Sequence, residues 1–505
     1  MTTQPETREA GVRTGLDPAQ VDGLTDLDAE AFRTAAHDVV DLIADYLANV
    51  ERFAVFPPIE PGTLAPLFPA DPPERPEPLA AILDDYRRLI EPNATHWQHP
   101  GFMAYFATTA SGAGILGEFL TAALGQNPML WRTSPIGTEL EGVVVDWLRQ
   151  ALGLPDAFDG LITDTASTST LLSLAAAREV AGLDASAQGL AGRADVGAPR
   201  VYASTEAHSA TEKACMTLGI GRSGVVKIPA NDRFEMDAGA LERAVADDRA
   251  AGRAPIAVVA TIGTTSSTSV DPVARIADLS EREGLWLHVD AAYAGVVAML
   301  PERRAPFAGW ERAQSIVVNP HKWLYTPLDA SLLLTTRMDA LRQAFSLVPE
   351  YLRTLDRGAP VRDYNEYTPQ LGRRFRALKL WLQLRWFGLE GLRRRIRHHI
   401  DLAQEFATWV DDDPEWERVA PTPFSTVCLR FRPAGLDDEA LDDLNARLID
   451  GVNRTGEVFL SHTRLAGRFT IRVAVGNLRT EERHVRRAWD LLRGEATRLV
   501  GGRAS

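Results

Sequence analysis

Between about residue 160 and residue 335, the chain alternates short apolar runs with longer runs rich in Ala and Leu. Several short runs are apolar without polar alternation, as strands are when both faces of their sheet are covered. Strands alternating with helices favour a mostly parallel α/β sheet, in which ligands bind beyond the carboxyl ends of the strands. The predicted strands are 161–163, 201–204, 256–262, 285–289, 316–318 and 332–335, and the predicted helices between them include 170–181 and 241–251.

The two ends of the chain differ from this central region. Residues 1–25 have the character of a loose tail, and the apolar residues of 27–50 fall near one helical face. Residues 55–78 are dense in proline, which predicts either a linker or an arm that wraps a partner subunit. After about residue 379, basic helical runs precede two strand-like runs, 425–433 and 468–476, and a closing helix at 482–500. A smaller α+β domain is therefore expected at the C-terminal end.

Composition excludes several classes of function. The 505 residues carry a net charge of −14, so an extended basic surface for nucleic acid is not expected. Two cysteines, Cys215 and Cys428, cannot build a disulfide framework or a four-thiolate zinc site, and no metal site is predicted. A reducing cytoplasm fits this cysteine usage. No signal peptide or membrane span is expected, because residues 1–25 lack an apolar core and 101–117 are too short and weakly apolar.

Two motifs place a reactive group at the end of a predicted strand. Lys322 in NPHKW follows the strand at 316–318, where desolvation would lower its pKa and free its amine to attack a carbonyl. The alternative is a lysine stem packed on Trp323 with its head in water. Asp290 in LWLHVDAAYAG ends a buried strand, where its carboxylate needs a partner such as a protonated pyridine nitrogen. A helix N-cap is the alternative for this aspartate.

Two further motifs favour a phosphate and a flat ring. In LITDTASTST, Thr165, Ala166 and Ser167 offer N–H groups and hydroxyls at a helix N-terminus, which suits a phosphate, unless they only cap the helix. His208 in STEAHSATEKA follows the strand at 201–204 and could stack on an aromatic ring, unless it is a structural histidine. The four motifs together match the needs of pyridoxal 5'-phosphate, whose pyridine ring acts as an electron sink.

On these motifs the sequence resembles the group II pyridoxal-phosphate decarboxylases, most closely the aromatic-L-amino-acid decarboxylases, from about residue 27 to residue 498. The resemblance implies an α/β fold of the type I pyridoxal-phosphate transferases. Its large domain has a mostly parallel seven-stranded sheet, joined by a smaller C-terminal α+β domain and an N-terminal helical arm. The implied divisions are a tail at 1–25, a dimerisation segment at 26–111, a cofactor domain at 112–379 and a small domain at 380–505. A cytoplasmic homodimer with shared active sites is expected, without nucleic-acid or membrane partners.

The resemblance also implies roles for individual residues. Lys322 would bind the cofactor aldehyde covalently, with Asp290 at the pyridine nitrogen and His208 stacked on the ring. The remaining implied cofactor contacts are Ala292, Thr165, Ala166, Ser167, Thr265 and Asn319. The implied substrate contacts are Trp97, Tyr105, Thr108, Met129 and Gly372.

Tyr351, in LVPEYLRTLDRG, matches a tyrosine on a mobile loop of the family that is implicated in protonating the carbon that loses carbon dioxide. Relatives with Phe at this position tend to form aldehydes, so the tyrosine favours plain decarboxylation. We therefore expect Lys322, Tyr351, His208 and Asp290 to be the catalytic residues.

The substrate is less narrowly defined. Gly372 matches a position where indole-handling members tend to have Gly, which favours tryptophan, with phenylalanine, tyrosine and DOPA also accepted. The chain departs from the family at Asp164, where relatives often have Gly, and at Asn127 and Met129, where animal relatives carry Ile and Phe. The alternatives are a glutamate or 2,4-diaminobutyrate decarboxylase, for which Arg132 is a candidate cation, an aldehyde synthase or transaminase, and a non-catalytic cofactor-binding protein.

Overall fold

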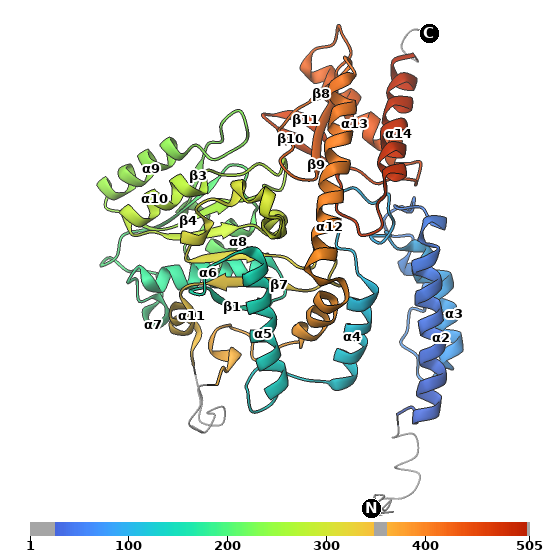
Figure 1. The fold of residues 1–505 in the computed structure, drawn as a ribbon, viewed down its shortest axis with the longest axis horizontal. Helices are drawn as coiled ribbons and strands as arrows, with labels where there is room; N and C mark the ends of the chain where they lie inside the picture. The colour runs from blue at the N-terminus through green and yellow to red at the C-terminus, as the bar shows by residue number, and fades with distance from the viewer. Residues whose placement is uncertain (1–25, 348–360, 502–505) are drawn as a thin grey trace, which may run out of the picture. The chain divides into compact units, whose positions relative to one another are not determined.

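The structure is a computed structural model that describes residues 26–347 and 361–501 (Figure 1). Two compact units make up the chain, Met1–Arg52 with Pro61–Pro92 and Phe53–Glu60 with Asn93–Ser505. The first unit contains the helices α2 (Ala29–Ala48) and α3 (Leu79–Asp85). The carboxylate of Asp28 caps α2 by accepting the N–H groups of Glu30 and Ala31, and no residue of α2 is buried.

A seven-stranded sheet forms the centre of the second unit, which confirms the predicted fold class. The spatial order is β1-β7-β6-β5-β4-β2-β3. β7 runs antiparallel to its neighbours β1 and β6, and the other pairs are parallel. The strands are β1 (Asp159–Thr163), β2 (Pro199–Ser204), β3 (Val225–Ile228), β4 (Ala254–Thr261), β5 (Trp286–Asp290), β6 (Ser315–Val318) and β7 (Ser331–Thr335). Within this sheet only β3, a short edge strand, was not predicted, because half of its four residues are partly exposed and one is a lysine.

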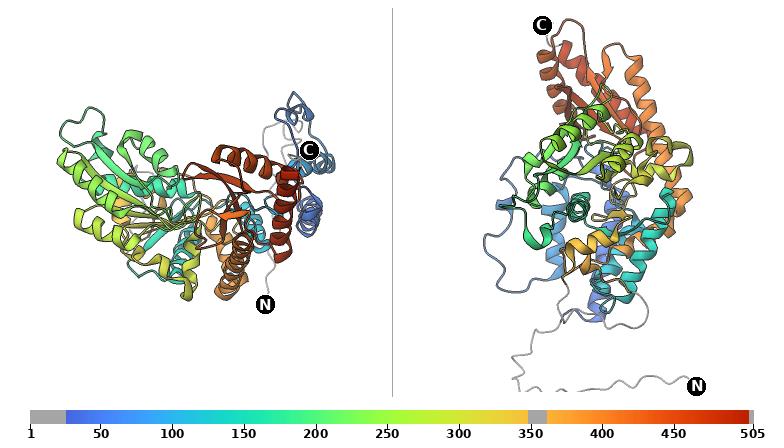
Figure 2. Two further views of the ribbon diagram at one scale, coloured as in Figure 1. Left: turned by 90° about the horizontal axis from the view of Figure 1, so that it is seen from above. Right: turned by 90° about the vertical axis from the view of Figure 1, so that its left-hand side faces the viewer.

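Helices cover both faces of this sheet, and each face has its own core (Figures 1 and 2). Side chains of β5 alternate between the two, so that Leu287 and Val289 join one core while Trp286 joins the other. On the first face lie α5 (Pro135–Leu152), α9 (Ala238–Ala250) and α10 (Val273–Glu283); on the second lie α6 (Ala166–Val180), α7 (Ala185–Gln188), α8 (Ala210–Thr217) and α11 (Met338–Phe345).

The reversed strand β7 determines how the segment after β6 is held. Val318 at the end of β6 pairs with Leu332 near the start of β7. Residues 319–330 therefore form a connection whose two ends are fixed to each other by the sheet. Lys322 lies in this connection, close to its β6 end.

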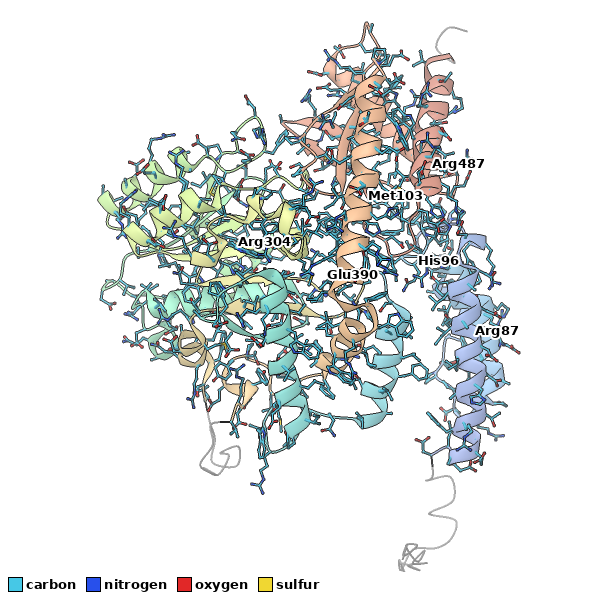
Figure 3. The ribbon with its side chains drawn as sticks, in the orientation of Figure 1. Arg87, His96, Met103, Arg304, Glu390 and Arg487 are labelled. Carbon is cyan, nitrogen blue, oxygen red and sulfur yellow. The ribbon has the colours of Figure 1, made fainter. Side chains whose placement is uncertain are left out.

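A second, antiparallel sheet with the order β10-β11-β9-β8 supports the C-terminal part of the chain. Its core includes Met103, which is fully buried (Figure 3). The long helix α12 (Arg376–Asp412) contacts both this sheet and α4 (Gly112–Leu124), and its helical backbone is broken at Gly388, where φ is 58°. The other elements are β8 (Trp416–Arg418), β9 (Thr426–Phe431), β10 (Ser461–Leu465), β11 (Arg468–Ala474), α13 (Asp438–Asn453) and α14 (Glu482–Gly501).

Charged side chains on the surface form many exposed pairs, among them Arg87–Asp84, Glu390–Arg394 and Arg487–Glu457 (Figure 3). Exposed pairs of this kind each stabilise a fold by less than about 1 kcal/mol. Within residues 26–347 and 361–501, no helix combines the length and apolarity that a membrane crossing requires. The same residues contain no cluster of three His, Cys, Asp or Glu side chains able to hold a metal ion.

Candidate active site

Lys322 lies in the connection after β6, with its N–H donating to the carbonyl of Asn319 at 3.0 Å. The adjacent His321 is fixed from both sides, since its N–H donates to Ala330 O and its Nδ1 accepts the N–H of Ala330. The lysine Nζ lies 5.4 Å from the ring centre of Phe106. Burial lowers the pKa of Lys322, and the carboxylate of Asp290 partly opposes that shift. The amine therefore carries the neutral form that a nucleophile needs more often than a solvated lysine does.

A column of stacked rings supports the lysine. Phe106 stacks on Tyr293 with a centroid separation of 3.8 Å, and Tyr293 stacks on Trp323 at 4.7 Å. The Nε1–H of Trp323 donates to Nδ1 of His399 on α12 at 2.9 Å. Trp323 is fully buried in this column.

Asp290 and His208 lie within electrostatic range of Lys322. Asp290 is the last residue of β5, and its Oδ1 accepts the N–H of Ala292 at 3.1 Å. His208 precedes α8, and its Nδ1 accepts the N–H of Ala210. Partial burial lowers the pKa of His208; the carboxylate of Asp290 opposes this shift, and the charge of Lys322 adds to it. The structure therefore brings together three residues that are far apart in the sequence.

The N-terminus of α6 has the predicted cluster of hydroxyls. Thr165 is the N-cap, and its hydroxyl accepts the N–H of Thr168, while Ser167 is exposed. The carboxylate of Asp164, which stands where relatives often have Gly, accepts the N–H of Thr165 at 2.6 Å. This N–H is therefore already used within the protein. Thr265, which follows β4, is exposed, and the buried Asn319 accepts a hydrogen bond from Ser331 Oγ at 2.7 Å.

The predicted substrate residues form two clusters. In the first, Trp97 stacks on Phe102 at 4.2 Å and on Tyr105 at 6.2 Å, and Thr108 follows, partly exposed, on the same segment.

The second cluster joins Met129 to Gly372 through Asn127. The Oδ1 of Asn127 accepts the N–H of Arg373, and its Nδ2 lies 3.5 Å from the sulfur of Met129. Arg373 is buried against Glu141 at 2.7 Å, and Glu141 also accepts the N–H of Ile162 in β1. Gly372 is exposed, with open space where a Cβ would stand. Tyr351 lies outside the described residues, so its predicted role stays a prediction.

Sequence reasoning missed Phe106, His399 and Arg472. Arg472, on β11, is 4% exposed, and its guanidinium carbon lies 5.2 Å from the ring centre of Phe106. It donates to Ser266 O and to Ser461 Oγ, while its remaining terminal nitrogen has no hydrogen-bond partner among the described residues. The signal for this residue was an arginine between Ile471 and Val473 in the middle of the strand RFTIRVAVG.

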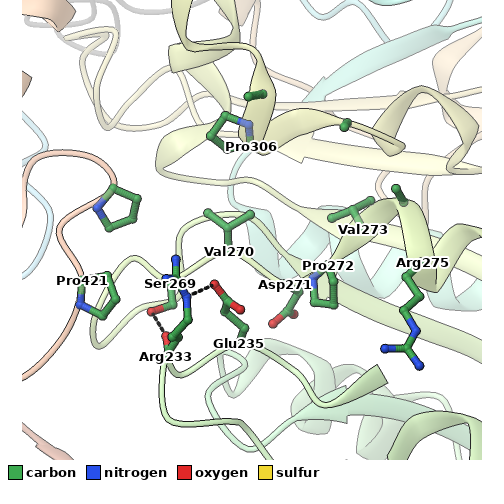
Figure 4. A pocket seen from close by; sticks show the side chains of 14 residues that line it. Arg233, Glu235, Ser269, Val270, Asp271, Pro272, Val273, Arg275, Pro306 and Pro421 are labelled. Carbon is green, nitrogen blue, oxygen red and sulfur yellow. Dashed lines mark hydrogen bonds and ion pairs between the residues drawn. The ribbon is translucent and has the colours of Figure 1, made fainter. Parts of the chain in front are cut away.

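A pocket of about 480 Å³ elsewhere in the second unit contains none of the predicted site residues (Figure 4). Several polar groups in its wall are already paired, because Arg233 binds Glu235 and its carbonyl accepts Ser269 Oγ. Asp271 in the same wall accepts two backbone N–H groups, and burial raises its pKa to about 7. The pocket is therefore not the candidate active site.

The donors and acceptors around Lys322 fit pyridoxal phosphate. A partly buried lysine amine suits its aldehyde, and the second carboxylate oxygen of Asp290 accepts no hydrogen bond within the described part of the chain. Exposed hydroxyls at the start of α6 suit its phosphate. Fold and site together define a pyridoxal-phosphate enzyme of fold type I.

Comparison with known proteins gives the family. Residues 61–432 match the pyridoxal-dependent decarboxylase conserved domain. The chain is 41% identical to a phenylacetaldehyde synthase of Arabidopsis thaliana, over 94% of this chain and 98% of that one. Tryptophan decarboxylase 2 of Oryza sativa subsp. japonica is 40% identical, over 95% and 97%. The crystal structure of Oryza sativa TDC with PLP and tryptamine superposes with a TM-score of 0.90 at 37% identity, covering 94% of this chain and 99% of that one.

The chain belongs to the pyridoxal-dependent decarboxylase family. This confirms the predicted fold type, the pyridoxal-phosphate cofactor and the enzyme class, an amino-acid decarboxylase.

Proposed function

We propose that the enzyme converts an L-amino acid with an aromatic side chain, tryptophan before phenylalanine, tyrosine or DOPA, into the amine and carbon dioxide. The observation that carries the proposal is the placement of Lys322 and Asp290 beyond the ends of adjacent parallel strands, where burial lowers the pKa of the lysine amine beside the carboxylate. Relatives named as tryptophan and tyrosine decarboxylases, about 40% identical over nearly the whole chain, support an aromatic substrate.

The residues divide the work of the reaction. Lys322 would hold the cofactor through its aldehyde, Asp290 would keep the pyridine nitrogen protonated, and Thr165, Ala166 and Ser167 would hold the phosphate. When bound, the cofactor supplies an electron sink for the bond between Cα and the carboxylate. That bond breaks, carbon dioxide leaves, and Tyr351 or His208 delivers one proton to Cα. The amine of Lys322 lies over the ring of Phe106, which Tyr293 supports by stacking.

Arg472 offers a partner for the substrate carboxylate, because one nitrogen of its buried guanidinium has no partner among the described residues. Arg132, the earlier candidate for an acidic side chain, is exposed and makes no ion pair among the described residues. An aromatic side chain would meet the rings of Trp97 and Tyr105.

The assignment is tested by borohydride reduction and by a panel of amino acids. Reduction of the purified holoenzyme should attach the cofactor to the peptide containing Lys322, and Lys322→Ala should lose both the label and turnover. Lys227→Ala, a surface lysine paired with Glu212, is the matched control and should keep both. A label on another lysine, or glutamate or diaminobutyrate as the best substrate, would contradict the assignment.

Aldehyde synthesis is the second candidate, favoured by the 41% identity to a phenylacetaldehyde synthase. Tyr351 argues for decarboxylation, and measuring hydrogen peroxide and aldehyde beside the amine decides between the two. We expect amine without peroxide from the wild type, and aldehyde with peroxide from Tyr351→Phe.

We also propose a cytoplasmic homodimer with shared active sites. The helix α2 buries no residue although it carries Phe32 and Val40, and Leu120 and Leu124 are exposed on α4. Light scattering of the purified protein measures the assembly. Inactive Lys322→Ala chains mixed with chains inactivated by Met129→Arg should regain activity if Met129 lines the site of the neighbouring subunit. A monomer, or no recovery in the mixed dimers, would contradict the proposal.

A further inference from the structure

The face of α6 that packs on the sheet carries hydroxyls where α/β sheets ordinarily meet aliphatic side chains. Ser169, Thr170 and Ser173 are each at most 1% exposed. The first two belong to the run TASTST, but they lie beyond the predicted phosphate cluster and point into the protein. Buried hydroxyls have to be hydrogen-bonded, so each of them restricts where α6 can lie.

One group of contacts joins α6 to three parts of the site. The Oγ of Ser169 lies 2.8 Å from Thr163 Oγ1 on β1 and 3.2 Å from Ser331 Oγ on β7. Ser331 in turn donates to Asn319, which follows β6. The first turn of α6 is thereby tied to the connection that holds Lys322.

A second group is centred on His288 of β5. The Nδ1 of His288 lies 2.9 Å from Ser315 Oγ and 3.1 Å from Ser173 Oγ, and its Nε2 lies 3.4 Å from Thr170 Oγ1. The indole N–H of Trp286, which can only donate, points at the two serine oxygens at 2.8 and 3.1 Å. Burial keeps His288 uncharged, so it has one ring N–H. Both ring nitrogens therefore face hydroxyls of α6, with Nδ1 beside Ser173 and Nε2 beside Thr170.

His288 and Asp290 are two residues apart on β5, so their side chains lie on the same face of the sheet. We propose that His288 is a positioning residue for the cofactor phosphate. It fixes the rotation and the axial position of α6 against β5, and this sets the span between the start of α6 and the carboxylate of Asp290. Hydrogen bonds are directional, whereas an aliphatic interface would let the helix slide. The inference rests on the proposed role of Thr165–Ser167 in holding the phosphate.

The test compares His288→Leu and His288→Asn with Leu287→Ala, whose side chain leaves the same strand on the opposite face and is equally buried. Dissociation constants of pyridoxal phosphate and of pyridoxal, which lacks the phosphate, are measured on the apoenzyme, with the ³¹P chemical shift of the bound cofactor. We expect His288→Leu to weaken pyridoxal-phosphate binding at least about tenfold and to move the ³¹P shift. His288→Asn, which retains hydrogen-bonding groups, should lie between it and the wild type. Pyridoxal affinity should be unchanged in both variants.

Leu287→Ala should lower the melting temperature without either effect on the cofactor. If His288→Leu does not fold, Ser173→Ala removes one hydroxyl of the same group and should show a smaller loss of the same kind. The inference is overturned if the folded variants bind pyridoxal phosphate as the wild type does, if pyridoxal affinity falls equally, or if Leu287→Ala weakens binding as much. A wild type that binds pyridoxal as tightly as pyridoxal phosphate would refute the role of α6 itself, while leaving decarboxylation intact.

Discussion

At the scale of single residues, the environment of Lys322 explains why this lysine differs from the surface lysines. Its amine faces the ring of Phe106 and shares the field of Asp290, while the turn around it is held by His321 and Asn319. Burial lowers its pKa, and the ring column behind Phe106 leaves its stem little freedom. The surroundings of Lys322 therefore lower the pKa of its amine below that of a solvated lysine.

Replacing Asp164 tests the electrostatics of the phosphate cluster. Its carboxylate occupies the N–H of Thr165 and brings a negative charge to the place where a phosphate would bind. Asp164→Asn should bind pyridoxal phosphate about twofold to fivefold more tightly, the size expected for one partly exposed charge pair. Asp156→Asn, a change on an exposed residue paired with Arg149, is the control. Titration of the apoenzyme measures both, and weaker binding by Asp164→Asn would contradict this prediction.

Gly372 tests the size of the substrate pocket. A Cβ at this position meets no atom within 4 Å, and its φ is not positive, so Gly372→Ser should fold normally. The added side chain should lower kcat/KM for tryptophan relative to phenylalanine by about tenfold, as a small steric change in a pocket does. Competition between the two amino acids measures the ratio. An unchanged ratio would show that Gly372 does not contact the substrate ring.

The site residues that could be predicted share one property. Lys322, Asp290 and Thr165 each lie in a short contiguous motif at the end of a strand, so a local pattern was enough to find them. Phe106, His399 and Arg472 come from three separate segments and reach the site only through the packing of α12 and β11. No local pattern encodes such long-range contacts, and the arginine in the middle of β11 was the one available clue.

At the scale of elements, α4 and α12 approach each other closely at Gly117. A Cβ on this glycine would lie 2.6 Å from the Cα of Lys379, so the contact depends on the missing side chain. Gly117→Ala should destabilise the fold by about 1–3 kcal/mol through overpacking. Gly142→Ala on α5, where a Cβ meets nothing within 4 Å, should be neutral or stabilising. Urea unfolding of both variants measures the difference, and equal stabilities would contradict the close packing.

Most elements could be predicted because the apolar runs of a covered sheet are distinctive. The antiparallel direction of β7 could not, since strand direction depends on pairing and not on composition. The two predicted basic helical runs correspond to the two halves of α12, which meet at Gly388, where the backbone is not helical.

For the whole molecule, three buried imidazoles predict sensitivity to acid. Burial lowers the pKa of His288 to about 4 and those of His321 and His399 to about 3. Below about pH 6.5, the pKa of histidine in the unfolded chain, these imidazoles are protonated in the unfolded state but not in the folded state. The free energy of unfolding therefore falls as the pH falls. Between its folded and unfolded pKa values, each imidazole lowers the free energy of unfolding by roughly 1.4 kcal/mol for each pH unit of acidification. Asp271, whose pKa burial raises to about 7, opposes this trend between about pH 4 and pH 7.

Urea unfolding at pH 7, 6 and 5 measures this slope. We expect stability to decrease toward pH 5, because the three imidazole shifts together exceed the opposing shift of Asp271, and His399→Asn should flatten the slope by the share of one imidazole. A variant with the slope of the wild type would show that His399 is not neutral in the fold.

The pairing of Val318 with Leu332 also constrains how such a chain can change over time. An insertion between these residues would either shift β7 by one position, exchanging the sides of all its residues, or bulge outward and carry the amine away from Phe106. Surface loops such as 189–198 tolerate length variation freely. The segment around the lysine does not tolerate insertions or deletions in this way, even at positions where it tolerates substitutions.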